Sequence, residues 1–170
     1  MSMQEEVKRE QEKLMDNATI FDILKMEHKD IKKLCRQIAD SGRYQDNVFN
    51  DIKTAFAIHM AGEERYLYSR LENNAETRFL VLGAYEEHDL CRKIISDIDK
   101  SSDMDIKYAK AKVLGETIDM HVKVEEDNLF KRARHVLSDE DEREIARQFM
   151  AEKMQSLSGM AAEATSAPAM

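Results

Sequence analysis

Apolar residues recur along the chain at alternating spacings of three and four, which is the period of one face of an α-helix. Four such stripes run over residues 24–38, 52–70, 81–98 and 111–132. A shorter pattern over about 139–155 places Ile145, Phe149 and Met154 on one side. The sequence therefore predicts four long helices followed by a short fifth one.

Polar turn residues separate the stripes. Thr19 with Asp22 and Ser102 with Asp105 have the spacing of capping boxes, and Ser138 precedes an acidic run that suits a helix N-terminus. The predicted connections are Ser41-Gly42, Asn73-Asn74 and Ser101-Ser102. Connections this short join neighbouring antiparallel helices. The expected fold is all-α, an up-down-up-down four-helix bundle with a short fifth C-terminal helix.

The same patterns divide the chain into three parts. Residues 1–17 are charged and weakly patterned, so we expect a polar N-terminal lead-in. Residues 18–155 form the predicted bundle with its C-terminal helix. Residues 156–170 are rich in Ala, Gly and Ser and contain the single proline, so we expect a disordered tail.

Composition and charge agree with a helical domain and limit its partners. The 170 residues include one proline and five glycines, and the net charge of −8 repels nucleic acid and anionic membranes. No apolar stretch approaches the roughly 20 residues of a membrane span, and the N-terminus is not a signal peptide. Cys35 and Cys91 are too far apart to suggest a disulfide framework. We expect a cytoplasmic protein that binds neither nucleic acid nor a membrane.

Two parts of the chain repeat one another. Residues 59–68 and 121–130 both read H-x-x-x-E-E-x-x-L-aromatic. The stripes that precede them each contain a Glu-His pair, Glu27-His28 and Glu87-His88. The repeat indicates that one helical hairpin occurs twice and contributes the same polar residues each time.

The repeated polar residues lie on the apolar faces of their helices. Residues four apart share one side of a helix, so His59 and Glu63 face inward with Phe56. Burying four imidazoles and two carboxylates costs several kcal/mol each unless a ligand neutralises them. We therefore predict a metal centre, and its candidate ligands are His28, His59, Glu63, His88, His121 and Glu125.

The candidate ligands also indicate which metal is bound. Nitrogen and oxygen ligands without thiolate suit iron, manganese or zinc. Six ligands exceed the three or four of an ordinary mononuclear site, so two ions are favoured, with carboxylates between them. The alternative is a purely structural bundle whose core histidines hold zinc or no metal at all.

The order His28, His59-x-x-x-Glu63, His88, His121-x-x-x-Glu125 resembles the hemerythrin-like family, the hemerythrin HHE cation-binding domain, over residues 19 to about 134. The resemblance implies a four-helix bundle with two non-haem iron ions, bridged by two carboxylates and an oxygen, with manganese or zinc less favoured. Members bind O2, sense oxygen or iron, react with NO or peroxide, or support iron–sulfur cluster repair. Ferritin-like proteins match less well because their sites use Glu-x-x-His pairs.

What the resemblance implies here is binding of, and reaction with, a small oxidant: O2, peroxide or NO. The alternative is an iron sensor or iron donor without turnover, with the C-terminal helix as the surface for a protein partner. Oxygen-carrying members have a second histidine four residues from the one in the third helix. Ala84 and Arg92 stand at those positions around His88, so peroxide or NO chemistry, or exchangeable iron, is favoured over reversible O2 binding.

Two tyrosines lie close to the predicted ligands. Tyr66 is one turn beyond Glu63, and Tyr85 is one turn before His88. Either could supply a phenolate or a hydrogen bond to the centre. The simpler interpretation is a core tyrosine whose hydroxyl reaches the surface.

Other polar residues have less specific expectations. Glu27 and Glu87 are candidates to orient a histidine from outside the ligand set. Glu64 and Glu126 point about 100° away from the ligands, so we expect them in solvent or paired with Lys or Arg. His135 follows the fourth stripe too far along to join the site, and the two cysteines are expected to be small buried apolar side chains.

Overall fold

The structure is a computed structural model that describes residues 17–166, and these residues form helices and short connections without strands. The prediction of an all-helical protein is confirmed. The elements are α2 (Ile20–Ser41), α3 (Asp46–Gly62), η1 (Glu63–Tyr68), α4 (Ser69–Leu71), α5 (Arg78–Lys100), α6 (Met104–Val124), η2 (Glu125–Leu129), α7 (Phe130–Val136) and α8 (Asp139–Ser166).

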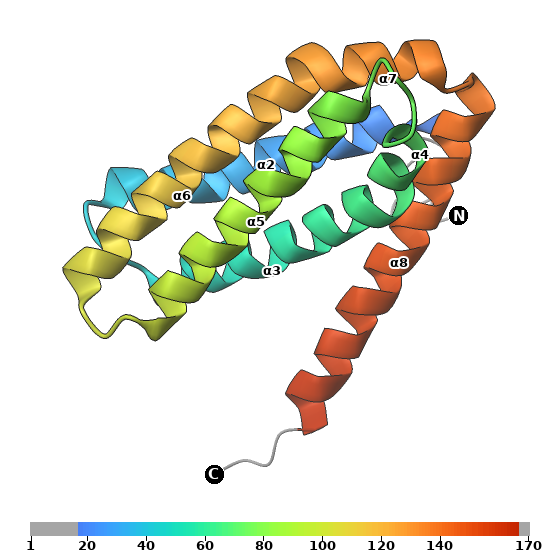
Figure 1. The fold of residues 1–170 in the computed structure, drawn as a ribbon. Coiled ribbons are helices and arrows are strands. Elements are labelled where there is room, and N and C mark those ends of the chain that lie inside the picture. The colour runs from blue at the N-terminus through green and yellow to red at the C-terminus, as the bar shows by residue number, and fades with distance from the viewer. Residues whose placement is uncertain (1–16, 167–170) are drawn as a thin grey trace.

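The four long helices lie side by side as a bundle (Figure 1). The connections from α2 to α3 and from α5 to α6 lie at one end, and the connection from α4 to α5 lies at the other. The segment α3, η1, α4 is one continuous helical path, as is α6, η2, α7, and in each path the middle part is a π-helical turn. The turns begin at Glu63 and Glu125, the two carboxylates of the predicted site.

Local capping explains where the helices begin and end. The Thr19 hydroxyl accepts from the Asp22 N–H, and the Asp22 carboxylate accepts from the Thr19 N–H, so the first capping box is confirmed. The second is corrected, because the cap of α6 is Asp103 rather than Ser102. The Asp103 carboxylate accepts from two N–H groups of the first turn, at 2.9 and 3.1 Å, and a carboxylate is a stronger acceptor there than a hydroxyl.

The buried apolar side chains form two clusters at different levels along the bundle. One cluster includes Phe21, Leu67 and Phe130 near the end that α8 covers, and the other includes Phe56 and Ile118 toward the opposite end. Along each long helix, the predicted histidines and carboxylates come near the point where the residues of one cluster give way to those of the other. Both cysteines are free; Cys91 is fully buried in the second cluster and Cys35 packs against it, as expected of small apolar side chains.

Helix α8 is longer than the sequence predicted. It runs to Ser166, whereas we expected it to end near Gln155 and a disordered tail to follow from residue 156. Extending an existing helix costs far less than nucleating a new one, which explains the difference. Residues 1–16 of the predicted lead-in and residues 167–170 of the tail lie outside the described residues.

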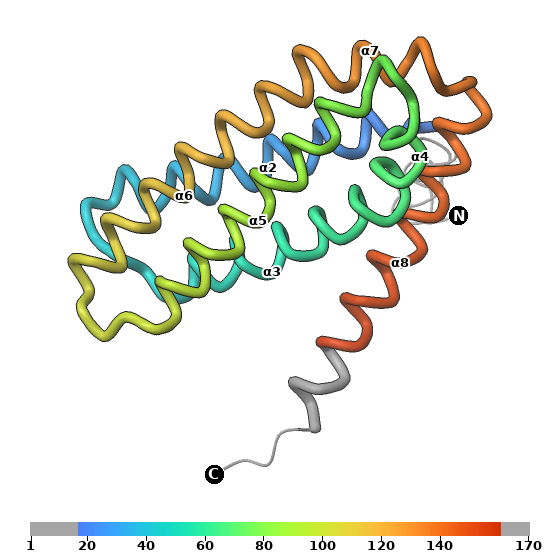
Figure 2. The backbone as a smooth tube through the Cα atoms, in the orientation of Figure 1, coloured from blue at the N-terminus to red at the C-terminus, as the bar shows by residue number. Residues whose placement is uncertain are grey.

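The first part of α8 packs on the end of the bundle, and the helix then runs away from it toward the C-terminus (Figure 2). Ile145, Ala146 and Phe149 are buried in the cluster that contains Phe21. Gly62 permits this contact, since a Cβ at that position would overlap the Phe149 ring. Among the described residues, no helix is both long enough and apolar enough to cross a membrane.

Candidate metal centre

The six predicted ligands meet at one level of the bundle, and each is at most 1% exposed. His28 comes from α2, His59 from α3, His88 from α5 and His121 from α6, while the two π-helical turns supply the carboxylates. The ligand atoms form two groups that could each hold a metal ion, with the atoms of each group within 4.8 Å of one another. These groups are His28, His59, Glu63 and Glu125, and Glu63, His88 and His121.

Each helical hairpin contributes one pair of histidines. The rings of His28 and His59 have centroids 4.8 Å apart, and those of His88 and His121 have centroids 4.7 Å apart. In the second pair the two Nε2 atoms are 3.1 Å apart. The duplicated hairpin seen in the sequence therefore corresponds to two histidine pairs in space.

The Glu63 carboxylate lies between the two pairs. Its Oε1 atom is 3.2 Å from His59 Nε2, and its Oε2 atom is 3.3 Å from His88 Nε2. Glu125 Oε2 is also central, at 3.3 Å from His28 Nε2 and 3.4 Å from His121 Nε2. Glu63 thus offers one oxygen to each group, which is the arrangement a carboxylate needs to bridge two cations.

A tyrosine outside the predicted set contacts the second group. Tyr68 is fully buried, and its hydroxyl donates to Glu125 Oε1 at 2.5 Å, while Glu63 Oε2 lies 3.2 Å from the same oxygen. Its oxygen is also 3.5 Å from His88 Nε2. The hydroxyl therefore contacts both carboxylates and one histidine.

The π-helical turn explains why Tyr68 reaches the centre. In η1 the backbone repeats from residue i to i+5 instead of i+4, so the side chain five residues after Glu63 returns to the ligand face. The ordinary helical period predicted Tyr66 there. Tyr66 instead lies near the surface beside Arg65 and Glu152, where the Glu152 carboxylate raises the pKa of its phenol.

Tyr85 does not join the centre either, because its hydroxyl donates to Glu72 at 3.4 Å. The sequence did contain a signal for Tyr68, namely the aromatic position that ends each copy of the repeat. Tyr68 occupies it in one copy and Phe130 in the other. Tyr68 stacks on His88 with centroids 5.5 Å apart, and Phe130 stacks on His28 at 5.9 Å.

Four further glutamates surround the histidines as a ring. Three of the histidines donate Nδ1–H to a carboxylate of the long helical segment that precedes them along the chain. The fourth, His28 of the first long helix, donates to Glu126 of the last long segment, so the four pairs form a closed ring. The pairs are Glu27 with His59, Glu64 with His88, Glu87 with His121, and Glu126 with His28, at 2.7 to 2.8 Å. Because a carboxylate only accepts, these bonds fix the proton on Nδ1 and leave each Nε2 free to coordinate.

This ring corrects one expectation and meets another. Glu64 and Glu126 were expected in solvent or paired with Lys or Arg of neighbouring helices. Glu64 does pair with Arg92, but both carboxylates also accept from histidines of a neighbouring helix. A side chain about 100° from the ligand face points toward the contact between its own helix and the neighbouring one. Its carboxylate therefore reaches the histidine of that neighbouring helix. Glu27 and Glu87 make the histidine contacts that their sequence positions suggested.

Two cations contact the ring from outside. Arg92 donates to Glu64 at 2.6 Å, and Lys153 of α8 donates to Glu27. Arg92 occupies one of the two positions, four residues from His88, at which this sequence lacks a further histidine, and it supports the carboxylate that holds His88. His135 is exposed on α7, away from both groups, as expected.

The electrostatics of the centre suit a bound cation. Among the described residues, the buried atoms without a hydrogen-bond partner include His28 Nε2, His59 Nε2, Glu63 Oε1 and Glu125 Oε2, which all belong to the first group. Burial alone would lower the pKa of His28, but the Glu125 and Glu63 carboxylates outweigh it and raise that pKa to about 10. A metal ion would displace the histidine protons and satisfy these unpartnered nitrogen and oxygen atoms in so negative a field.

Comparison with known proteins agrees with this geometry. The sequence profile of the hemerythrin HHE cation binding domain matches residues 19–133, which contain all six ligands and the four glutamates around them. Neither a curated protein nor a solved structure matches the chain significantly. The match covers most of the chain and the whole candidate centre, so this protein belongs to the hemerythrin HHE cation-binding domain family.

Proposed function

We propose that the protein is a non-haem di-iron protein that binds and reacts with a small oxidant: O2, peroxide or NO. The observation that carries this proposal is the position of Glu63, with one carboxylate oxygen toward each histidine pair. The four Nε2 atoms and the carboxylates of Glu63 and Glu125 would hold the ions. Bound iron would supply Lewis acidity and electrons. Manganese and zinc suit the same ligands but are the less favoured alternatives.

The protein's own residues would set the geometry and exclude water. The four glutamates fix the Nδ1 proton and the ring orientation of each histidine before any ion arrives. Apolar clusters at levels on either side of the centre keep bulk water out, which strengthens every charge interaction inside. This pre-organisation supports chemistry at the site rather than metal storage alone.

Tyr68 would provide a hydrogen-bond donor at one side of the centre. Burial, together with the Glu125 and Glu63 carboxylates, raises the pKa of Tyr68 well above its usual value, so the hydroxyl stays protonated at neutral pH. A hydroxyl that stays protonated beside His88 would donate a hydrogen bond to an oxidant there and would stabilise the negative charge that develops on it, as in peroxide reduction. Phe130 offers no such donor beside His28. We therefore propose peroxide or NO consumption ahead of reversible O2 carriage.

Iron loading followed by addition of oxidant tests this proposal. The protein is loaded with ferrous iron without air and mixed with hydrogen peroxide or NO, and ultraviolet–visible absorption is followed. We expect absorption from an oxidised iron centre and consumption of the oxidant, and we expect His59→Ala and Glu125→Ala to lose iron. Retention of full iron by both variants would contradict the proposed ligand set.

One observation favours a second candidate function, an iron sensor or donor that signals through α8 to a protein partner. Lys153 on α8 contacts Glu27, which in turn holds His59 Nδ1, so the C-terminal helix is linked to the ligand set. If this candidate is correct, chelation of the metal should expose α8 to protease, and Lys153→Met should do so without chelation. Equal cleavage of metal-free and metal-loaded protein would contradict it.

Helix direction and cellular location belong to the same proposal. We take the four long helices to alternate in direction, which the short connections at opposite ends of the bundle support. We also propose a cytoplasmic protein without a nucleic-acid or membrane partner, and the net charge of −8 supports this.

A further inference from the structure

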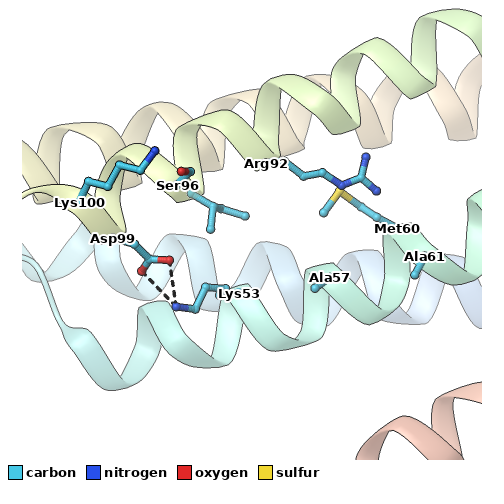
Figure 3. Close-up of a pocket in the computed structure, with 9 residues that line it drawn as sticks. Lys53, Ala57, Met60, Ala61, Arg92, Ser96, Asp99 and Lys100 are labelled. Carbon is cyan, nitrogen blue, oxygen red and sulfur yellow. Dashed lines mark hydrogen bonds and ion pairs between the residues drawn. The ribbon is translucent and has the colours of Figure 1, made fainter.

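A cavity of about 460 Å³ that is open to solvent lies between α3 and α5 (Figure 3), and Ala57, Ala61 and Lys100 in its lining are exposed. Helix α5 contributes Arg92, Ser96 and Lys100, which are four residues apart and therefore follow one side of that helix. Helix α3 contributes Lys53 and the small residues Ala57 and Ala61. The volume is in the range of pockets that bind small molecules.

Positive charge exceeds negative charge in the lining of this cavity. Lys53, Arg92 and Lys100 line it together with a single carboxylate, that of Asp99, which accepts from Lys53 at 3.0 and 3.1 Å. Arg92 pairs with Glu64 and Asp89 outside the lining, so among the described residues Lys100 is the lining cation without an ion pair. The surplus stands out in a chain whose net charge is −8. It favours an anion as the occupant.

Two hydrogen-bond donors in the cavity, those of Ser96 and Lys100, lack partners among the described residues. Among the described residues, Lys100 makes no ion pair and the Ser96 hydroxyl makes no hydrogen bond. The Arg92 guanidinium donates one hydrogen bond to Glu64 and one to Asp89. Because a guanidinium has five N–H groups, Arg92 still has N–H groups to offer a ligand. A line of donors along one helix face can therefore hold an acidic group.

The remainder of the lining is apolar. The Ala57 and Ala61 side chains are too short to fill the space between the two helices, and Ile95 lines the same cavity from α5. A ligand that fits both parts has an acidic group and an apolar body. Inorganic anions match only the donors.

We propose that this cavity binds a small organic anion, a carboxylate or a phosphate ester with an apolar body, through Arg92, Ser96 and Lys100. The site is separate from the ligand set and needs no bound metal. It nevertheless adjoins the centre, because Arg92 also donates to Glu64, which holds His88.

Binding of phenyl phosphate and benzoate to the full chain tests the proposal, with benzyl alcohol as the neutral probe. Titration calorimetry at low ionic strength is expected to show saturable binding of about one anion per chain, and the stronger probe identifies the preferred acidic group. Benzyl alcohol is expected not to bind. Absence of saturation by either anion up to about 10 mM, or equal binding of the neutral probe, would overturn the proposal.

Variants locate the binding. Lys100→Gln is expected to weaken binding about tenfold, and Ala61→Leu is expected to abolish it by filling the hollow while leaving every charge in place. Lys93→Gln is the matched control, since Lys93 lies on α5, is exposed, pairs with Asp97 and does not line the cavity. Circular dichroism checks that each variant folds. Equal weakening by Lys93→Gln and Lys100→Gln would mean attraction by overall charge and would refute a site here.

Discussion

Tyr68 and Phe130 occupy the same position in the two copies of the repeat, but only Tyr68 brings a hydroxyl to the carboxylates. Each ring stacks on a histidine, Tyr68 on His88 and Phe130 on His28. The Tyr68 hydroxyl donates to Glu125 Oε1 at 2.5 Å. The two histidine pairs are therefore similar in ligands and different in the hydrogen-bond donor beside them.

Replacing that hydroxyl should slow the reaction without emptying the site. Tyr68→Phe keeps the stacked ring and all six ligands but removes the hydrogen-bond donor, so we expect peroxide consumption to fall about 100-fold at unchanged iron content. Stopped-flow absorption with iron analysis measures both. Tyr85→Phe is the control and should react as wild type does, since its hydroxyl contacts Glu72. A Tyr68→Phe rate equal to wild type would remove Tyr68 from the mechanism.

The glutamate ring should contribute to metal affinity. Glu87 accepts from His121 Nδ1 at 2.7 Å, and Glu87→Gln removes the charge that makes the imidazole a strong donor to a metal. We expect metal affinity to fall about 10- to 100-fold, measured by competition with a chelator. Glu86→Gln is the matched control, because Glu86 is exposed on the same helix. Equal affinities for the two variants would show that the ring does not tune the metal.

Metal binding should displace protons from the histidines. In the metal-free protein the pKa is raised from 6.5 to about 10 for His28 and to about 9 for His88, because nearby carboxylates outweigh burial. A folded-state pKa above the unfolded value stabilises the fold below pH 6.5, and this contribution disappears as the pH rises through 9 to 10.

Two measurements check these signs. Adding metal to metal-free protein at pH 8 should release protons in a pH-stat, and urea unfolding should show that the metal-free protein is less stable at pH 10 than at pH 7. His135→Gln should change neither result, since His135 is exposed. Metal binding without proton release would contradict the protonated state described for His28 and His88.

Gly62 should be required for the docking of α8. A Cβ at Gly62 would overlap the Phe149 ring, so Gly62→Ala should cost about 1 to 3 kcal/mol in urea unfolding. Gly83→Ala is the matched control, because a Cβ there meets nothing within 4 Å, and it should stabilise the protein by about 0.5 to 1 kcal/mol. Equal effects of the two substitutions would show that α8 does not pack closely at Gly62.

The helices and the six predicted metal ligands could be predicted from the sequence because the same helical period, with spacings of three and four residues, describes both. His59 and Glu63 are four residues apart on an apolar stripe, and that spacing alone places them together in the core. The repeat then brings His121 and Glu125 to the same level. Local spacing and duplication place each of these residues on an inward face, and the antiparallel packing of a four-helix bundle brings those faces together.

The remaining features depend on departures from that period or on neighbouring helices. Tyr68 reaches Glu125 because the π-helical turn adds a residue to the repeat, and the ordinary helical period favoured Tyr66 instead. Glu64 and Glu126 reach histidines of other helices, which a single-helix projection cannot show. The contact of Lys153 with Glu27 joins residues far apart in the sequence and requires the path of α8.

Anaerobic titration of the metal-free protein with ferrous iron tests the central claim most directly. Binding is followed to its end point and compared with metal analysis of the protein isolated from its own host. Two histidine pairs that share Glu63 predict an end point of about two irons per chain, and Glu63→Ala should lower it. An end point of about one iron, or no tight binding at all, would contradict the di-iron account.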